Sequence, residues 1–80
     1  MVIKILGSGC ANCQKLSDLA SKAVEQLGLD AEIVKVTDYA DIMAYGVIST
    51  PALVVDEELK VAGRVPSYDD VVTILQRSAD

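Results

Sequence analysis

The chain has 80 residues, 51% of them hydrophobic, and its 12 acidic and 7 basic residues give a net charge of −5. A chain of this length buries about 60% of the surface that its unfolded form exposes, which suffices for one small core. We therefore expect a single domain over residues 1–80. The acidic balance, without a cluster of Lys and Arg, excludes nucleic acid and anionic membrane surfaces as expected partners.

The sequence also bears on cellular location. No segment approaches the roughly 18 consecutive apolar residues that a transmembrane helix needs. Lys4 is followed almost at once by a segment of small residues and cysteines at 7–13, unlike the apolar region of a signal peptide. These features predict a cytoplasmic protein, in which two closely spaced cysteines are more often catalytic or metal-binding than a permanent bridge.

The first half of the chain predicts a strand, a helix and a second strand. Val2–Leu6 is a short apolar run typical of a strand buried on both faces. From Cys10 onward, apolar residues recur at helical spacing, and Gly28 supplies the stop. Ala31–Val36 then has the composition of a second strand. The apolar positions of the helix are Leu16, Leu19, Ala20, Ala23, Val24 and Leu27.

The second half predicts a short helix, a β-hairpin and a last helix. Thr37 or Asp38 can cap a short helix that runs to about Tyr45 and is closed by Gly46. Two apolar segments, 52–55 and 59–62, flank an acidic turn and have the pattern of a hairpin entered through a proline. A capping box over 67–70 then starts the final helix. The predicted order is β-α-β-α-β-β-α.

Both cysteines lie in one C-x-x-C motif, Cys10-Ala11-Asn12-Cys13, between the first strand and the first helix. The unpaired N–H groups and the positive dipole end of that helix favour a thiolate at Cys10. In such positions the pKa of a cysteine falls from about 8.5 to roughly 3.5–7.5. Cys13 follows about one helical turn later and can close a disulfide with Cys10. We therefore predict that Cys10 is the nucleophile and Cys13 the resolving thiol, with no bound cofactor.

The predicted element order, the C-x-x-C motif after the first strand and Thr50-Pro51 before the third strand resemble the minimal thioredoxin/glutaredoxin fold over essentially the whole chain. Within that superfamily, the chain resembles the small thioredoxin-like redox-active disulfide proteins of bacteria and archaea. The resemblance implies an α/β fold with a four-stranded mixed sheet and three helices. It also implies a thiol–disulfide oxidoreductase that exchanges electrons with the disulfides of proteins or small molecules and with a dithiol reductase. We expect it to act as a monomer.

The resemblance further assigns three residues to a substrate site. Pro51 matches a cis-proline that faces the two sulfurs, and a cis peptide costs only about 0.5–1 kcal/mol at an X-Pro bond. The backbone of Thr50 is implied to pair with an extended substrate segment. Gly63, after the fourth strand, matches the glycine that keeps the far wall of the groove open.

The chain departs from both families at several positions. Thioredoxins carry an aromatic residue before the first cysteine and a proline before the second, where this chain has Gly9 and Asn12. Its first strand has no carboxylate to accept a proton from Cys13, because Lys4 is the only ionisable residue there. Glutaredoxins often have a basic residue at the position of Gly7 and an aromatic residue inside the motif. We therefore expect a protein dithiol reductase to serve the chain more readily than glutathione.

A soft-metal carrier is the alternative function, because Gly9–Cys13 also resembles the loop of heavy-metal-associated domains in which two thiolates bind Cu(I) or a similar ion. That fold needs a hairpin directly after the first helix and a terminal strand, and Ser8 replaces its methionine. A zinc site would have half of its usual ligands. We therefore expect no metal site. The presence of both cysteines also argues against a third possibility, an interaction module on a degenerate thioredoxin-like scaffold.

The remaining polar side chains are assigned no chemistry. Lys4 is expected to be solvated or to snorkel, although an ammonium group near the motif would favour the thiolates. Residues 56–58 are expected to form a solvated hairpin tip. Tyr39, Tyr45 and Tyr68 fall at helical positions and are expected to pack.

Overall fold

The structure, a computed structural model, describes residues 1–8 and 11–79. Its elements follow the order β-α-β-α-β-β-α, which confirms the predicted order and the α/β fold class. Within the described residues, no helix combines the length and the apolar character needed to cross a bilayer. The elements are β1 (Val2–Leu6), α1 (Ala11–Leu27), β2 (Glu32–Val36), α2 (Tyr39–Ala44), β3 (Ala52–Val55), β4 (Glu58–Ala62) and α3 (Tyr68–Ala79).

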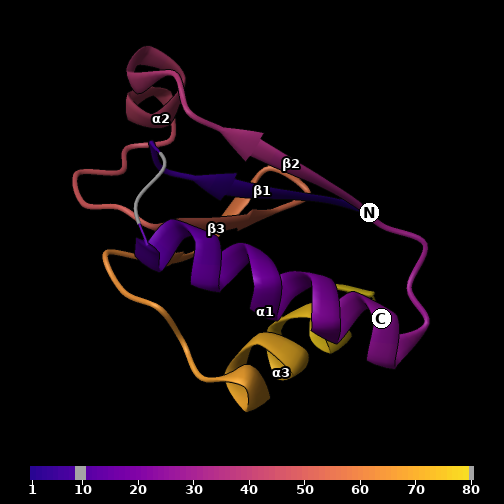
Figure 1. Cartoon of the computed structure of the whole chain (residues 1–80). Helices are drawn as coiled ribbons and strands as arrows, with labels where there is room; N and C mark the ends of the chain where they lie inside the picture. The colour runs from indigo at the N-terminus through magenta and orange to yellow at the C-terminus, as the bar shows by residue number, and fades with distance from the viewer. Residues whose placement is uncertain (9–10, 80) are drawn as a thin grey trace.

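The four strands form one mixed sheet in the order β2-β1-β3-β4. β1 pairs with β2 in parallel and with β3 antiparallel, and β3 pairs with β4 antiparallel. Helices α1 and α3 cover one face of the sheet, and α2 lies on the other face near one end (Figure 1). Because β1 is a central strand, the chain that leaves it at Gly7 starts from the middle of the sheet.

Alternating side chains of the central strands supply two separate cores. Ile3 and Ile5 of β1 belong to the core under α1 and α3, whereas Leu6 belongs to the core under α2, as the twofold period of a strand requires. β1 is therefore packed on both faces, as predicted. The buried residues of the larger core are Ile3, Ile5, Leu16, Ala20, Ala23, Leu53, Val55, Val61, Val71 and Leu75. Those of the smaller core are Leu6, Ile42, Val47, Ala52 and Val54.

Side-chain caps set the starts of α2 and α3. The Asp38 carboxylate accepts hydrogen bonds from the backbone N–H of Ala40 at 2.8 Å and of Asp41 at 3.3 Å. Ser67 Oγ accepts a hydrogen bond from the backbone N–H of Asp70 at 3.2 Å. Each cap satisfies donors that a helix start leaves unpaired, which is why the sequence signals for these two starts are reliable.

Three boundaries differ from the prediction: β2 begins at Glu32 rather than Ala31, α2 ends at Ala44 rather than about Tyr45, and β4 begins one residue early. The sequence pattern predicts a turn over 56–58, whereas only Asp56 and Glu57 form the turn and Glu58 begins β4. Asp56 and Glu57 have positive φ angles of 47° and 70°, the backbone of a two-residue hairpin turn. This tight turn leaves Glu58 paired with Val55 in the strand ladder.

Candidate active site

Four segments meet at one end of the molecule. The end of β1, the start of α1 and the loops 45–51 and 63–67 lie together at the left of Figure 1. The sheet order produces this meeting, because β1 and β3 are neighbours that run in opposite directions and Leu6 pairs with Ala52. The end of β1 therefore lies beside the start of β3, where the loop 45–51 arrives.

Cys13 lies in the first turn of α1 and is buried, with 7% of its surface exposed. It is disulfide-bonded in the structure. Its Sγ packs directly on the backbone of Gly7: a Cβ added at Gly7 would overlap this sulfur and would lie 3.4 Å from Cys13 Cβ. The N–H of Gly7 donates to the carbonyl of Val36 at 2.9 Å, which continues the pairing of β1 with β2. The missing side chain at Gly7 thus lets the sulfur sit against the end of the central strand.

The Thr50–Pro51 segment approaches the same point. The place that a Gly7 Cβ would take lies 3.5 Å from Thr50 Cβ, so Thr50 and Cys13 both border the space beside Gly7. The Thr50–Pro51 peptide bond is cis. Pro51 is buried, whereas Thr50 is exposed. The structure therefore brings Cys13 together with two of the residues that the resemblance assigns to a substrate site.

Gly63, the third of these residues, lies against the same loop. Its N–H donates a hydrogen bond to the carbonyl of Pro51 at 2.9 Å. Its φ angle of +78° suits glycine, and a Cβ there would approach Ser49 Cβ to 3.1 Å. Thr50, Pro51 and Gly63 are thus neighbours in space, while their contact with substrate stays a prediction.

Cys10, the predicted nucleophile, lies outside the described residues, as does Gly9. In the sequence, Cys10 directly precedes Ala11, the first residue of α1. The two residues between the cysteines, Ala11 and Asn12, are exposed. The role of Cys10 therefore remains a prediction from its place before the helix.

Gly7 is the residue at this site that sequence reasoning did not identify. The pattern shows it as a glycine that ends a strand, and nothing local separates it from other glycines in that position. Its importance comes from the approach of the first turn of α1, which is a tertiary contact. The only local signal is its place between a buried strand and the C-x-x-C segment.

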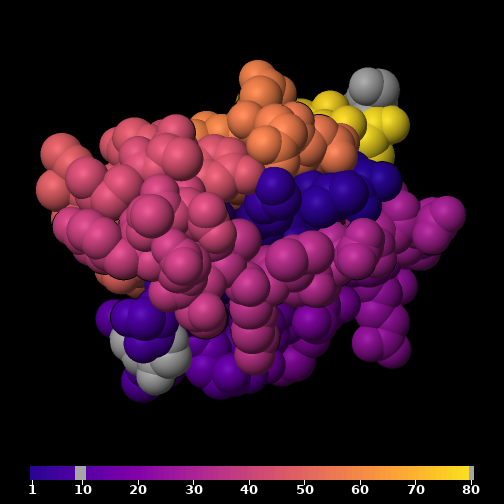
Figure 2. Space-filling model, turned by 90° about the horizontal axis from the view of Figure 1, so that it is seen from above, coloured from indigo at the N-terminus to yellow at the C-terminus, as the bar shows by residue number. Residues whose placement is uncertain are grey.

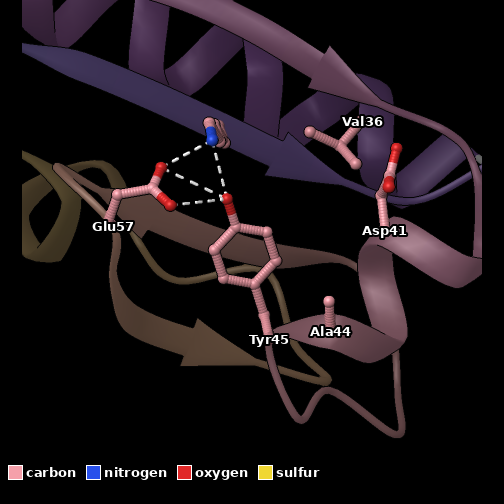
Figure 3. Close-up of a pocket in the computed structure, with 6 residues that line it drawn as sticks. Val36, Asp41, Ala44, Tyr45 and Glu57 are labelled. Carbon is pink, nitrogen blue, oxygen red and sulfur yellow. Dashed lines mark hydrogen bonds and ion pairs between the residues drawn. The ribbon is translucent and has the colours of Figure 1, made fainter.

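A polar cluster of Lys4, Tyr45 and Glu57 lies on the α2 face of the sheet (Figure 3). Lys4 Nζ donates to Tyr45 Oη at 2.7 Å and pairs with Glu57 Oε1 at 2.5 Å, and Tyr45 Oη donates to Glu57 Oε2 at 3.0 Å. The hydrogen bond between Lys4 and Glu57 is the main reason that the pKa of Glu57 is lowered and the pKa of Lys4 is raised. The bond that Lys4 donates to Tyr45 raises the pKa of Lys4 further, and the bond that Tyr45 donates to Glu57 lowers the pKa of Glu57 further. The cluster borders a cavity of about 460 Å³, which Val36, Asp41 and Ala44 also line.

The cluster adds contacts that the sequence did not predict. The Lys4 side chain is 25% exposed, which fits the expected snorkelling side chain, and its ammonium group is paired. The hairpin tip is exposed, as expected, and the Glu57 side chain is 66% exposed, but its carboxylate also accepts bonds from both Lys4 and Tyr45. Seen from above in Figure 2, part of β1 (indigo) is visible between β2 (magenta) and the β3–β4 hairpin (orange), with α2 (pink) to the left, so α2 leaves part of this face open.

The tyrosines divide between packing and exposure. Tyr45 and Tyr68 pack against the two cores, as expected. Tyr39 does not, because 75% of its surface is exposed. The physical reason is the size of α2, which has six residues and buries only Ile42.

The element order separates the redox function from the metal-carrier alternative. A heavy-metal-associated domain needs a hairpin directly after the first helix and a strand as its last element. In this chain α2 follows β2, and the last element is the helix α3. Within residues 1–8 and 11–79, no three or more His, Cys, Asp or Glu side chains are grouped so that they could hold a metal ion.

Comparisons with known proteins identify the family. The family model described as a thioredoxin domain matches residues 1–76. A thioredoxin of Methanothermobacter thermautotrophicus is 47% identical over 75 residues, which cover 94% of this chain and 97% of that protein. A thioredoxin of Methanocaldococcus jannaschii is 42% identical over 71 residues, which cover 89% of this chain and 81% of that protein. The chain therefore belongs to the thioredoxin family, and its activity is that of a thiol–disulfide oxidoreductase.

Proposed function

We propose that Cys10 and Cys13 are the dithiol couple of this oxidoreductase and that it exchanges with the disulfides of proteins or small molecules. The Cys10 thiolate attacks one sulfur of the substrate disulfide, and the other substrate sulfur leaves as a thiolate that takes up a proton. Cys13, as a thiolate, then attacks Cys10 Sγ in this mixed disulfide and releases the second substrate thiol. Two electrons pass from the dithiol to the substrate, and no bound cofactor takes part.

One observation carries this proposal: Cys13 and Thr50 meet beside Gly7. The sulfur of Cys13 lies in the first turn of a 17-residue helix, whose dipole favours a thiolate at the residue before it. Thr50 is exposed next to this sulfur and is followed by the buried Pro51, so its backbone is held at the surface. An exposed backbone segment beside the start of a strand is a surface on which a substrate peptide can pair.

A redox titration in defined dithiol buffers, paired with a turnover assay on a disulfide substrate, tests the proposal. We expect one two-electron transition and turnover in the wild type. Both should be lost in Cys10→Ser, because neither an internal disulfide nor a first attack is then available. Turnover by Cys10→Ser at the wild-type rate would overturn the proposal.

We further propose that residues 1–80 act as one domain, as a monomer in the cytoplasm, and that a protein dithiol reductase restores the dithiol form. Gly7 and the residues Ala11 and Asn12 lack the basic and aromatic side chains associated with glutathione recognition. We expect a flavin-dependent dithiol reductase to reduce the oxidised protein faster than glutathione does. Rapid turnover with glutathione and a stable glutathione adduct at Cys10 would contradict this choice of partner.

A further inference from the structure

Ile48 is the most exposed large hydrophobic side chain of the described residues, with 94% of its surface exposed. It does not lie in a loose loop. Val47 before it belongs to the core under α2, and Pro51 after it is buried. Between these anchors only Ile48, Ser49 and Thr50 are exposed, so packing on both sides holds Ile48 out in solvent.

Ile48 stands at the rim of the site. Thr50 borders the space beside Gly7 that also borders the Cys13 sulfur. Ile48 precedes Thr50 by two residues, and two residues of extended chain span at most about 7 Å. A peptide segment that places its sulfur at the C-x-x-C motif and runs past Thr50 therefore has Ile48 within reach of its side chains.

Arg64 stands on the adjoining loop. A Cβ at Gly63 would lie 3.1 Å from Ser49 Cβ, so the loops that contain Ser49 and Gly63 touch. Ile48 directly precedes Ser49, and Arg64 directly follows Gly63. Arg64 is exposed. An apolar side chain and a cation therefore flank the same junction.

The charge around the site differs from the charge of the whole chain. The described segments that line it, 11–15, 47–51 and 63–67, contain two charged side chains, Lys15 and Arg64, and no Asp or Glu. The chain as a whole carries a net charge of −5. An acidic side chain of a substrate thus meets a cation at this rim and no carboxylate from these segments.

We propose that Ile48 and Arg64 select the substrate: a protein segment in which an apolar and an acidic side chain flank the cysteine of the disulfide. The inference rests on the proposed function, because it assumes that substrates react at the C-x-x-C motif. Covering the exposed isoleucine removes apolar surface from water on both partners. The guanidinium of Arg64 can hold a carboxylate through two parallel hydrogen bonds.

Two peptide disulfides and one small disulfide test this selection. The first peptide has leucine and glutamate beside its cysteine, the second has serine and lysine, and the small substrate is hydroxyethyl disulfide. We expect the wild type to favour the first peptide over the second by about tenfold or more in kcat/KM. Ile48→Ser should lower this ratio by about tenfold, mainly through KM, and Arg64→Ser by a few fold, with a loss that shrinks at high salt. Damage to the fold alone would slow both peptides and leave the ratio unchanged.

Leu59→Ser and Arg77→Ser are matched controls. Leu59 is 42% exposed on β4 near the hairpin turn, and Arg77 is exposed in the last turn of α3, so neither lies at the rim. We expect both variants to keep the wild-type ratio. The inference would be overturned if the wild type had equal kcat/KM for the two peptides, or if Ile48→Ser and Arg64→Ser kept the wild-type ratio. In either case, turnover of hydroxyethyl disulfide would still uphold the proposed function. A wild type that reacts with none of the three would overturn the proposed function, and the inference with it.

Discussion

A side chain at Gly7 would take the space that the Cys13 sulfur fills. Gly7 is itself buried, and its N–H is bonded to the carbonyl of Val36, so the end of β1 is held from the far side. The sulfur would therefore have to move away from the strand and from Thr50. The close approach of two elements and a φ angle of +154° both require glycine at this position.

Gly7→Ala should lower the free energy of unfolding by about 1–3 kcal/mol, the usual cost of overpacking a filled site. It should also slow resolution of the mixed disulfide, because Cys13 is displaced. Urea unfolding and stopped-flow thiol exchange measure the two effects. Gly28→Ala is the control: Gly7 and Gly28 both have positive φ angles, 154° and 65°, but a Cβ at Gly28 meets nothing within 4 Å. Gly28→Ala should lower the free energy of unfolding but leave the rate of thiol exchange unchanged. An unchanged exchange rate in Gly7→Ala would show that Gly7 does not position the Cys13 sulfur.

At the scale of elements, the cluster of Lys4, Tyr45 and Glu57 joins three distant pieces of chain. Lys4 is in β1, Tyr45 follows α2, and Glu57 is in the turn between β3 and β4. Tyr45 is also the first residue of the loop 45–51. The cluster therefore fixes the start of the loop that carries Thr50 and Pro51 to the site.

Glu57→Gln should change how stability depends on pH. Because the pKa of Glu57 is lowered by folding, its contribution is present above its usual value of 4.5 and is lost as the pH falls through the folded pKa. The pKa of Lys4 is raised, so its contribution is present below 10.5 and is lost only as the pH rises through a still higher folded pKa. The difference in unfolding free energy between wild type and variant should be constant from about pH 5 to 10 and narrow in acid.

Urea titrations from neutral to acidic pH measure this difference. Glu58→Gln is the matched control, because Glu58 pairs at 3.3 Å with Lys60, two residues away on the same strand, and ties no separate elements together. We expect Glu58→Gln to follow the wild-type pH profile. If the two variants show the same pH profile, the cluster does not have the role assigned to it.

The sequence pattern predicts most elements because the signals for them are local. The helical spacing from Leu16 to Leu27 and the stop at Gly28 need no knowledge of the rest of the fold. The hairpin turn is different: whether Glu58 belongs to the turn or to β4 depends on the pairing of β3 with β4, which has a register shift between Leu53 and Val54. Turn boundaries of this kind are set by tertiary packing.

The same distinction applies to the site. Thr50, Pro51 and Gly63 could be named from the sequence because a family resemblance ties them to the C-x-x-C motif. The pairing of Lys4 with Glu57 could not, since 53 residues separate the two in the chain. Contacts at such a separation leave no periodic pattern and no local motif.

At the scale of the whole molecule, charge is distributed unevenly. The acidic turn at Asp56 and Glu57 follows the end of β3, whereas Pro51 precedes its start, so turn and site lie at opposite ends of this strand. The described segments at the site carry Lys15 and Arg64 in a chain with a net charge of −5. Under the proposed selection by Arg64, the net charge repels acidic segments of a partner from the molecule as a whole and the cation at the rim attracts them, which favours docking in one orientation.

The central claim is that Cys10 attacks the substrate disulfide and Cys13 resolves the mixed disulfide. Trapping of the mixed disulfide tests this claim most directly. Cys13→Ser and Cys10→Ser are each incubated with a peptide disulfide at about pH 6, where a low-pKa thiol reacts first, and the products are mapped by mass spectrometry. We expect Cys13→Ser to accumulate the peptide on Cys10, because nothing resolves the adduct, and Cys10→Ser to remain unmodified. An adduct on Cys13 in Cys10→Ser, with Cys10 unmodified in Cys13→Ser, would contradict the account.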